Sequence, residues 1–235
     1  MKKNRMDPGI RRSVAVWAVK QAVATMLFCV VGLLSAGRPD WDGAWAIFGV
    51  LMGYFLFTLA FLVPRNPGLY AERSGLKKGT KKWDVALSMI VAYTPLWICI
   101  VAGLDARHGW SRVLPIDVRL ESFFAAVMGL AILSWAMMSN SFFAATVRIQ
   151  ADRGQTVVSA GPYRVVRHPG YLGSIVFYTG LAGMSGSFWS FVVVALSLVP
   201  LVIRTALEDA TLQRELAGYK EYCACTKYRL IPHVW

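Results

Sequence analysis

Residues 161–173 read GPYRVVRHPGYLG, a dense polar segment set between long apolar stretches. The segment holds two arginines, one histidine, two tyrosines and two prolines. Polar side chains at this density beside a lipid-facing helix are costly unless they bind something. Pro169 also restricts the preceding His168 to an extended or turn conformation. The segment therefore predicts a shaped ligand-binding loop at a membrane surface.

The apolar stretches on both sides of this loop indicate a polytopic membrane protein. The chain has 235 residues, of which 56% are hydrophobic, and its mean hydropathy is +0.48. Roughly 20 apolar residues suffice to cross a bilayer as a helix. We expect an all-α membrane helical bundle of about six transmembrane helices, with the last two joined by a Gly/Ser turn as a C-terminal hairpin. The expected ranges are 14–36, 44–63, 85–104, 122–147, 171–184 and 188–203.

The distribution of basic residues predicts the orientation of the bundle. Lys and Arg concentrate near the N-terminus, in the connections 65–82 and 148–167, and in the tail 204–229. The positive-inside rule therefore places both termini and the loop in the cytoplasm. An anionic leaflet accounts for the net charge of +12, because it attracts basic loops. We expect a multi-pass protein of a bacterial inner membrane rather than of the endoplasmic reticulum, with membrane lipids and no nucleic acid as partners.

The cysteines do not indicate a metal site. Cys29 and Cys99 fall within apolar helices, where free cysteine behaves as a small hydrophobe. Cys223 and Cys225 have only His233 nearby as a further ligand, and a metal site needs more ligands at suitable spacing. We expect no bound metal.

A second polar group follows the expected hairpin. Arg204 and Glu208 lie four residues apart, on one face of a helix, where they form either an ion pair or part of a site. Because the hairpin helices are antiparallel neighbours, His168 and Tyr171 end at the same level as this pair. Cations, an anion and aromatic faces together suit a ligand that combines a carboxylate, a sulfonium and an adenosine.

These motifs resemble a known family. GPY, RHPxY, a hydrophobic hairpin, RxxxED and a YxxY…RLIP ending resemble the isoprenylcysteine carboxyl methyltransferases, integral-membrane enzymes related to phospholipid methyltransferases. The resemblance covers roughly residue 150 to the C-terminus and implies S-adenosyl-L-methionine as cofactor. We expect N-terminal transmembrane helices in residues 1–147 and a methyltransferase core, with cofactor loop, hairpin and cytoplasmic tail, in residues 148–235.

The resemblance also implies the site residues. Arg204 falls on the family's acceptor-contacting arginine and is the expected catalytic residue. Glu208 falls on the acidic cofactor ligand, with Asp209 in place of a second glutamate, and Gln155 stands where the isoprenylcysteine enzymes have histidine. The cofactor-binding residues implied are Gln150, Gln155, Thr156, Val157, Val158, Tyr163, Arg167, His168, Pro169, Gly170, Tyr171 and Glu208.

The expected reaction is methyl transfer to a lipidic or small hydrophobic acceptor, with carboxylate O-methylation favoured. The acceptor is expected to enter sideways from the bilayer, between the hairpin and the fourth helix. A small-thiol S-methyltransferase and a phospholipid N-methyltransferase remain alternatives, as does a non-catalytic membrane transport or binding protein. Transporters place substrate sites near the midplane, whereas these polar residues gather at one surface. Asn140, within the fourth expected helix, predicts interhelical hydrogen bonding.

Overall fold

The computed structural model describes residues 7–235, in which the regular secondary structure is helical, without strands. The basic residues Lys2, Lys3 and Arg5 lie outside the described residues. The predicted all-α polytopic bundle is confirmed. The segments long and apolar enough to cross a membrane are Pro8–Ala36, Asp42–Leu62, Lys82–His108, Ile116–Ser139 and Trp189–Glu215.

The first two predicted spans are confirmed as helices. The first begins after Asp7, whose carboxylate accepts the backbone N–H groups of Gly9 and Ile10 and so caps the helix. Lys20 reaches back from this helix and donates to the Ser74 carbonyl at 2.8 Å. The elements are α1 (Pro8–Ala36), α2 (Asp42–Phe57), its π-helical continuation η1 (Thr58–Leu62), and the short α3 (Pro67–Glu72).

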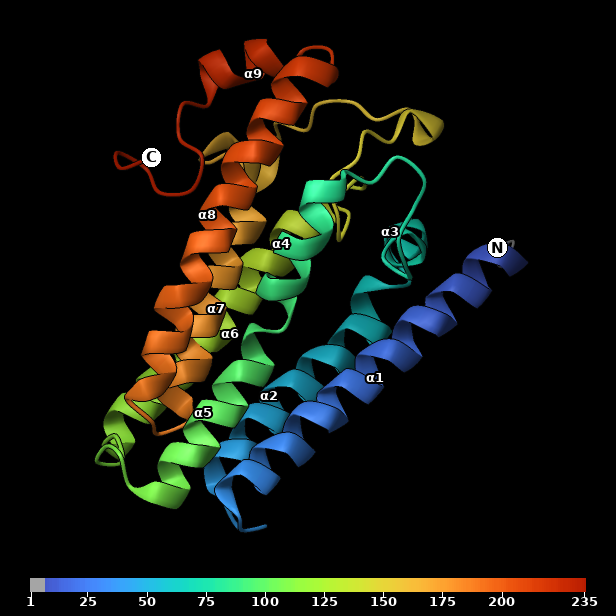
Figure 1. Ribbon diagram of the computed structural model, residues 1–235. Coiled ribbons are helices and arrows are strands. Elements are labelled where there is room, and N and C mark those ends of the chain that lie inside the picture. The colour runs from blue at the N-terminus through green and yellow to red at the C-terminus, as the bar shows by residue number, and fades with distance from the viewer. Residues whose placement is uncertain (1–6) are drawn as a thin grey trace.

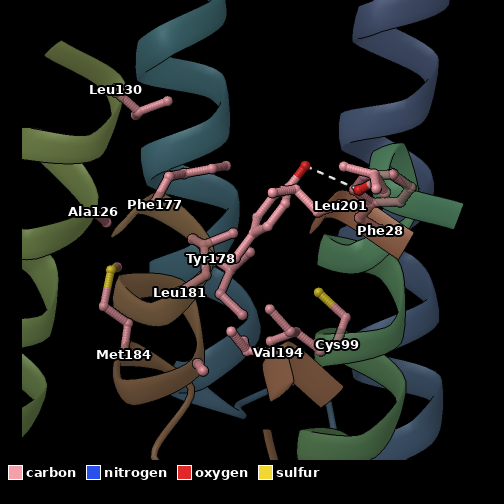
Figure 2. Packing of buried hydrophobic residues seen from close by; sticks show 14 of the residues in the cluster. Phe28, Cys99, Ala126, Leu130, Phe177, Tyr178, Leu181, Met184, Val194 and Leu201 are labelled. Carbon is pink, nitrogen blue, oxygen red and sulfur yellow. Dashed lines mark hydrogen bonds between the residues drawn. The ribbon is translucent and has the colours of Figure 1, made fainter. Parts of the chain in front are cut away.

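The third predicted span is interrupted at Tyr93, which divides it into α4 (Lys82–Ala92) and α5 (Thr94–His108). Proline has no N–H, so Pro95 cannot donate to the Val91 carbonyl as the helix would require. The hydroxyl of Tyr178 donates to that carbonyl instead, at 2.9 Å. Figure 2 shows Tyr178 at the centre of the main buried cluster, with Leu181 and Phe177 beside it. The break is therefore stabilised by a side chain of α7 (Pro169–Met184).

The fourth predicted span ends eight residues early, because α6 (Ile116–Ser139) stops before Asn140 rather than at Val147. The Asn140 side chain accepts the N–H of Phe142 at 2.9 Å, a local bond that competes with the helix. Its amide also donates to the hydroxyl of Tyr163 at 3.2 Å. The prediction of interhelical bonding by Asn140 within a transmembrane helix is therefore wrong. The chain continues irregularly through two short turns, η2 (Ala151–Arg153) and η3 (Gly161–Arg164).

The predicted C-terminal hairpin is confirmed, with different limits. Helix α7 (Pro169–Met184) has 16 residues, a length of about 24 Å against a hydrocarbon core of about 30 Å. The expected number of about six spans is therefore reached only if this short helix is counted. Helix α8 (Trp189–Glu215) runs about three turns beyond residue 203, so Arg204 and Glu208 stand on it. A short helix, α9 (Tyr219–Cys225), follows.

Helices α6 and α7 are in backbone contact along a line of glycines. A Cβ atom at Gly129 would overlap the backbone nitrogen of Phe177, and one at Gly173 would lie 2.8 Å from the Gly129 carbonyl. Small residues allow this close approach between membrane helices. The α6–α7 seam is closed, so the predicted entry of an acceptor between the hairpin and the fourth helix is wrong.

Both ends of the described chain lie at the same end of the bundle (Figure 1). Helix α3, segment 140–168 and α9 cover that end, whereas the α1–α2, α5–α6 and α7–α8 connections lie at the opposite one. The topology therefore gathers all the expected site residues at one end.

Candidate functional site

A cavity of about 360 Å³ lies between segment 140–168 and the helices beneath it. Its volume falls at the lower end of the range for small-molecule sites, about 300–1,000 Å³. Most of the predicted site residues line it. These are Gln150, Gln155, Tyr163, Arg167, His168, Gly170, Tyr171, Arg204 and Glu208.

Four predicted cofactor residues lie outside the cavity wall. Val157 and Val158 pack against the buried cluster formed around Tyr163. Thr156 is exposed. Pro169 is the first residue of α7, where its fixed φ suits the start of a helix. Cofactor contact by these four residues stays a prediction.

Arg204 is held rigidly by Asp84, a residue that the sequence did not single out. The Arg204 Nε lies 2.6 Å from one carboxylate oxygen of Asp84, and Nη2 lies 3.2 Å from the other. Nη2 also donates to the Ala145 carbonyl at 2.7 Å. Asp84 is fully buried and Arg204 is 7% exposed. A bidentate pair of this kind fixes the direction of the guanidinium as well as its place.

Glu208 does not pair with Arg204, the residue four positions before it that the spacing suggested. The Tyr171 hydroxyl donates to the Glu208 carboxylate, and the partner of Arg204 is Asp84. Tyr171 also lies beneath the Arg204 guanidinium, 5.2 Å from ring centroid to Cζ, and stacks on His168. The predicted juxtaposition of these four side chains is present, but no ion pair joins Arg204 to Glu208 within the described residues.

Asp209 joins the RHP motif to the C-terminal segment. It is fully buried, and both Nε and Nη2 of Arg167 donate to it, at 2.8 and 3.0 Å. His168 Nε2 lies 3.2 Å from the same carboxylate, and Arg229 Nε donates to it at 2.9 Å. Arg167 Nη1 donates to the backbone carbonyl of Thr226. The donors of Arg167 are thus engaged within the protein, which makes it a brace of the cavity wall.

The loop above the cavity is braced by its own polar side chains. The Gln150 amide donates to the Phe142 carbonyl at 2.6 Å and its oxygen accepts Arg153 Nη1 at 2.5 Å. The Gln155 side-chain oxygen accepts the Gln150 N–H at 2.7 Å. Gln150, 1% exposed, therefore shapes the wall with an amide already used inside the loop.

A charged cluster ties the same loop to α3. Arg148 Nε lies 2.7 Å from Glu72, and Nη1 lies 2.7 Å from Asp152. The bonds to Asp152 and Glu72 raise the pKa of Arg148. Burial raises the pKa of Tyr163, which therefore stays a neutral hydroxyl at physiological pH.

Four further residues at or behind the cavity wall were not among the predicted site residues. Arg73, Asn140 and Arg148 line the cavity, and Asp84 supports Arg204 from behind. A usable signal existed for Asp84, since a carboxylate in the first turn of an apolar span is unusual unless it is paired. The other three lie in connections whose course could not be predicted.

The predicted site residues that line the cavity fall within a segment with a known family signature. Residues 120–217 match the phospholipid methyltransferase family. The match confirms the predicted relationship to the membrane methyltransferases. It begins within α6 and leaves residues 1–119 outside, while the predicted domain division at residue 147 stays a prediction. No curated protein matches the chain significantly.

The phospholipid methyltransferase match implies a methyl donor, and the cavity fits S-adenosylmethionine chemically. The Glu208 carboxylate and the tyrosine faces favour a cation. The Asn140 and Gln155 side chains offer amide groups to the polar edges of a nucleoside. Within residues 7–235, no three His, Cys, Asp or Glu side chains are grouped to hold a metal ion.

Proposed function

We propose that the chain is an S-adenosylmethionine-dependent membrane methyltransferase that acts on a lipidic or small hydrophobic acceptor, with a carboxylate favoured. One observation carries the proposal. A single cavity joins a polar wall, with Glu208 and His168, to an apolar wall that includes Phe28 and Leu51, and Arg204 lines the same cavity. A water-soluble donor and an apolar acceptor can therefore meet in one place.

The residues of the polar wall would hold the cofactor, which when bound supplies a methyl group activated by its sulfonium. Glu208 is directed by the Tyr171 hydroxyl, and its negative charge attracts a cationic group. Asn140 is fixed through Phe142 and Tyr163. Preorganised contacts of this kind position two reactants, and proximity can contribute about 7–11 kcal/mol of a barrier.

Arg204 would orient the acceptor. Its guanidinium is fixed by Asp84 and by the Ala145 carbonyl, so it offers a cation at a defined position. A carboxylate pairs well with guanidinium. It is also nucleophilic as it stands, so methyl transfer to it requires no general base. This supports a carboxylate over a thiol, which must lose a proton first.

A phospholipid amine is the second candidate acceptor, because the matched family is described as phospholipid methyltransferase. An ammonium group must be deprotonated before it accepts a methyl group. Glu208 is the carboxylate that lines the cavity, and it already accepts the Tyr171 hydroxyl. This arrangement favours the carboxylate acceptor over the amine.

The proposed membrane orientation follows from charge. The described basic residues of the N-terminal segment, the connections 65–82 and 148–167, and the tail all lie at the end that holds the cavity. The positive-inside rule makes that end cytoplasmic, where the water-soluble cofactor can enter. We propose a bacterial inner membrane as the location.

The acceptor class can be tested with purified protein in lipid nanodiscs and methyl-labelled S-adenosylmethionine. Oleate, phosphatidylethanolamine and octanethiol present a carboxylate, an amine and a thiol, and mass spectrometry identifies the methylated product. We expect methyl oleate to form, and its loss in Arg204→Met. Exclusive methylation of the amine or the thiol would contradict the carboxylate assignment.

A further inference from the structure

Arg73 lies in the cavity wall with no evident structural task. It follows α3 and lines the cavity together with Arg204. Its Nη1 is buried and has no hydrogen-bond partner among the described residues. The guanidinium carbon lies 5.5 Å from the centroid of the Phe143 ring, and such a contact orients a cation without neutralising it.

The carboxylates of this region are already engaged elsewhere. Glu72, next to Arg73 in the chain, pairs with Arg148 at 2.7 Å. Asp84 pairs with Arg204, and Glu208 accepts the Tyr171 hydroxyl. Within residues 7–235 no salt bridge includes Arg73. A cation with a buried, unpaired N–H group and no counter-charge is costly, so its retention points to a ligand that supplies the charge.

The electrostatic surroundings of Arg73 support this reading. Burial lowers the pKa of Arg73. The positive charge of Arg204 lowers the same pKa further. Arginine stays charged nonetheless. Of the arginines that line the cavity, Arg148, Arg167 and Arg204 each have a carboxylate partner, and within residues 7–235 Arg73 has none.

The cavity below Arg73 is apolar and reaches the side of the bundle. Phe28 of α1, Leu51 of α2, and Val91 of α4 line it. Gln21 on α1 and Ala92 on α4 also line it and are exposed. In residues 7–235, α1 packs against α2, α3 and α5, whereas α4 packs against α5 and α8. The exposed residues that line this apolar part of the cavity thus belong to α1 and α4, away from the closed α6–α7 seam.

We propose that Arg73 binds an oxyanion, a carboxylate or a phosphate, of an amphiphilic acceptor whose apolar chain lies along Phe28 and Leu51. The proposal rests on the methyltransferase function and adds a substrate class to it. Arg73 is a substrate-binding residue in this account. Arg73 lines the cavity together with Tyr54 of the apolar helix α2, which assigns it to the acceptor rather than to the cofactor.

Binding of three amphiphiles with the same chain tests the proposal in nanodiscs. Oleate carries a carboxylate, 1-oleoyl-lysophosphatidate a phosphate, and oleyl alcohol no charge. We expect the intact protein to bind at least one anionic amphiphile about tenfold or more tightly than the alcohol, and the tighter of the two identifies the anion. Arg73→Met should reduce this preference, with Arg204 accounting for what remains, and leave the Kd for S-adenosylmethionine unchanged.

Arg65→Met serves as the matched control. Arg65 is an exposed cation that precedes α3 and lies outside this cavity, so its removal should keep the preference. The melting temperature of Arg73→Met without ligand should equal or exceed that of the intact protein, because an uncompensated cation is removed. Arg73→Lys should keep part of the preference.

Two results would overturn the proposal. One is an unchanged anion preference in Arg73→Met. The other is a loss of cofactor affinity or of folding in that variant, which would make Arg73 a cofactor or structural residue. If the proposed function itself is wrong, the result is a different one, because the intact protein will then not bind S-adenosylmethionine at all.

Discussion

The buried pair of Asp84 and Arg204 predicts a large loss of stability when one charge is removed. Asp84→Asn preserves the volume of the side chain and an acceptor for the Val147 N–H, which donates to Asp84 at 2.6 Å. It leaves the Arg204 guanidinium, 7% exposed, without its counter-charge. Breaking a buried pair in this way costs about 3–5 kcal/mol. That is a change of roughly a hundredfold to several thousandfold in the folding equilibrium.

The same two helices supply the control. Lys81 and Glu215 form an ion pair of 2.7 Å at the α4–α8 junction, with side chains 30% and 40% exposed. Exposed pairs contribute about 0–1 kcal/mol, so Glu215→Gln should change the free energy of unfolding by no more than that. The difference between the two free-energy costs comes from the burial of the Asp84–Arg204 pair, since each variant removes one ion pair.

Unfolding in mixed micelles with increasing dodecyl sulfate, followed by tryptophan fluorescence, gives the free energies. The double variant Asp84→Asn/Arg204→Met should be less destabilised than the sum of its parts, because the unpaired cation is gone. Additive losses, or an Asp84→Asn cost within about 1 kcal/mol of the Glu215→Gln cost, would refute the reasoning.

Three further predictions concern the rest of the fold. Gly129→Ala should destabilise the protein by about 1–3 kcal/mol in the same unfolding assay, whereas Gly53→Ala, with nothing within 4 Å of the added carbon, should not destabilise it. Asp209→Asn should increase hydrogen exchange in the C-terminal segment, since the carboxylate that the segment's Arg229 contacts becomes neutral; unchanged protection would contradict this. Burial raises the pKa of Tyr222 to about 12, and its hydroxyl donates to the Tyr163 carbonyl. Because the folded protein favours the neutral hydroxyl, its contribution to stability is complete below about pH 10 and is lost as the pH rises to about 12. A pH titration of stability should show a shallower alkaline decrease in Tyr222→Phe, and an identical slope would show that this tyrosine does not contribute.

Hydropathy and charge were enough to predict the class of fold, because lipid contact and orientation depend on composition. The limits of the helices depend on finer interactions. Phe142 and Phe143 continue the apolar stretch past Ser139, so α6 looked eight residues longer than it is. Its end is set by the Asn140 side chain. The break at Tyr93 could have been predicted from Pro95, whereas its support by Tyr178 could not.

The sequence predicted which residues line the cavity better than it predicted the contacts among them. The RHP motif and the Arg204–Glu208 spacing identified side chains that do line the cavity. Asp84 and Arg204 are 120 residues apart, and no local pattern couples positions at that separation. Asp209 was expected only as the replacement for a second glutamate, and the structure shows that it holds Arg167 and His168 in place. Side chains of the same type therefore carry ligand-facing and bracing roles that only the structure separates.

Calorimetric titration of the nanodisc-embedded protein with S-adenosylmethionine tests the central claim most directly. The account predicts saturable binding to the intact protein, about tenfold weaker binding to Glu208→Gln, and unchanged binding to Glu221→Gln, an exposed residue of α9. Absence of binding to the folded intact protein, or equal affinity in Glu208→Gln, would contradict it.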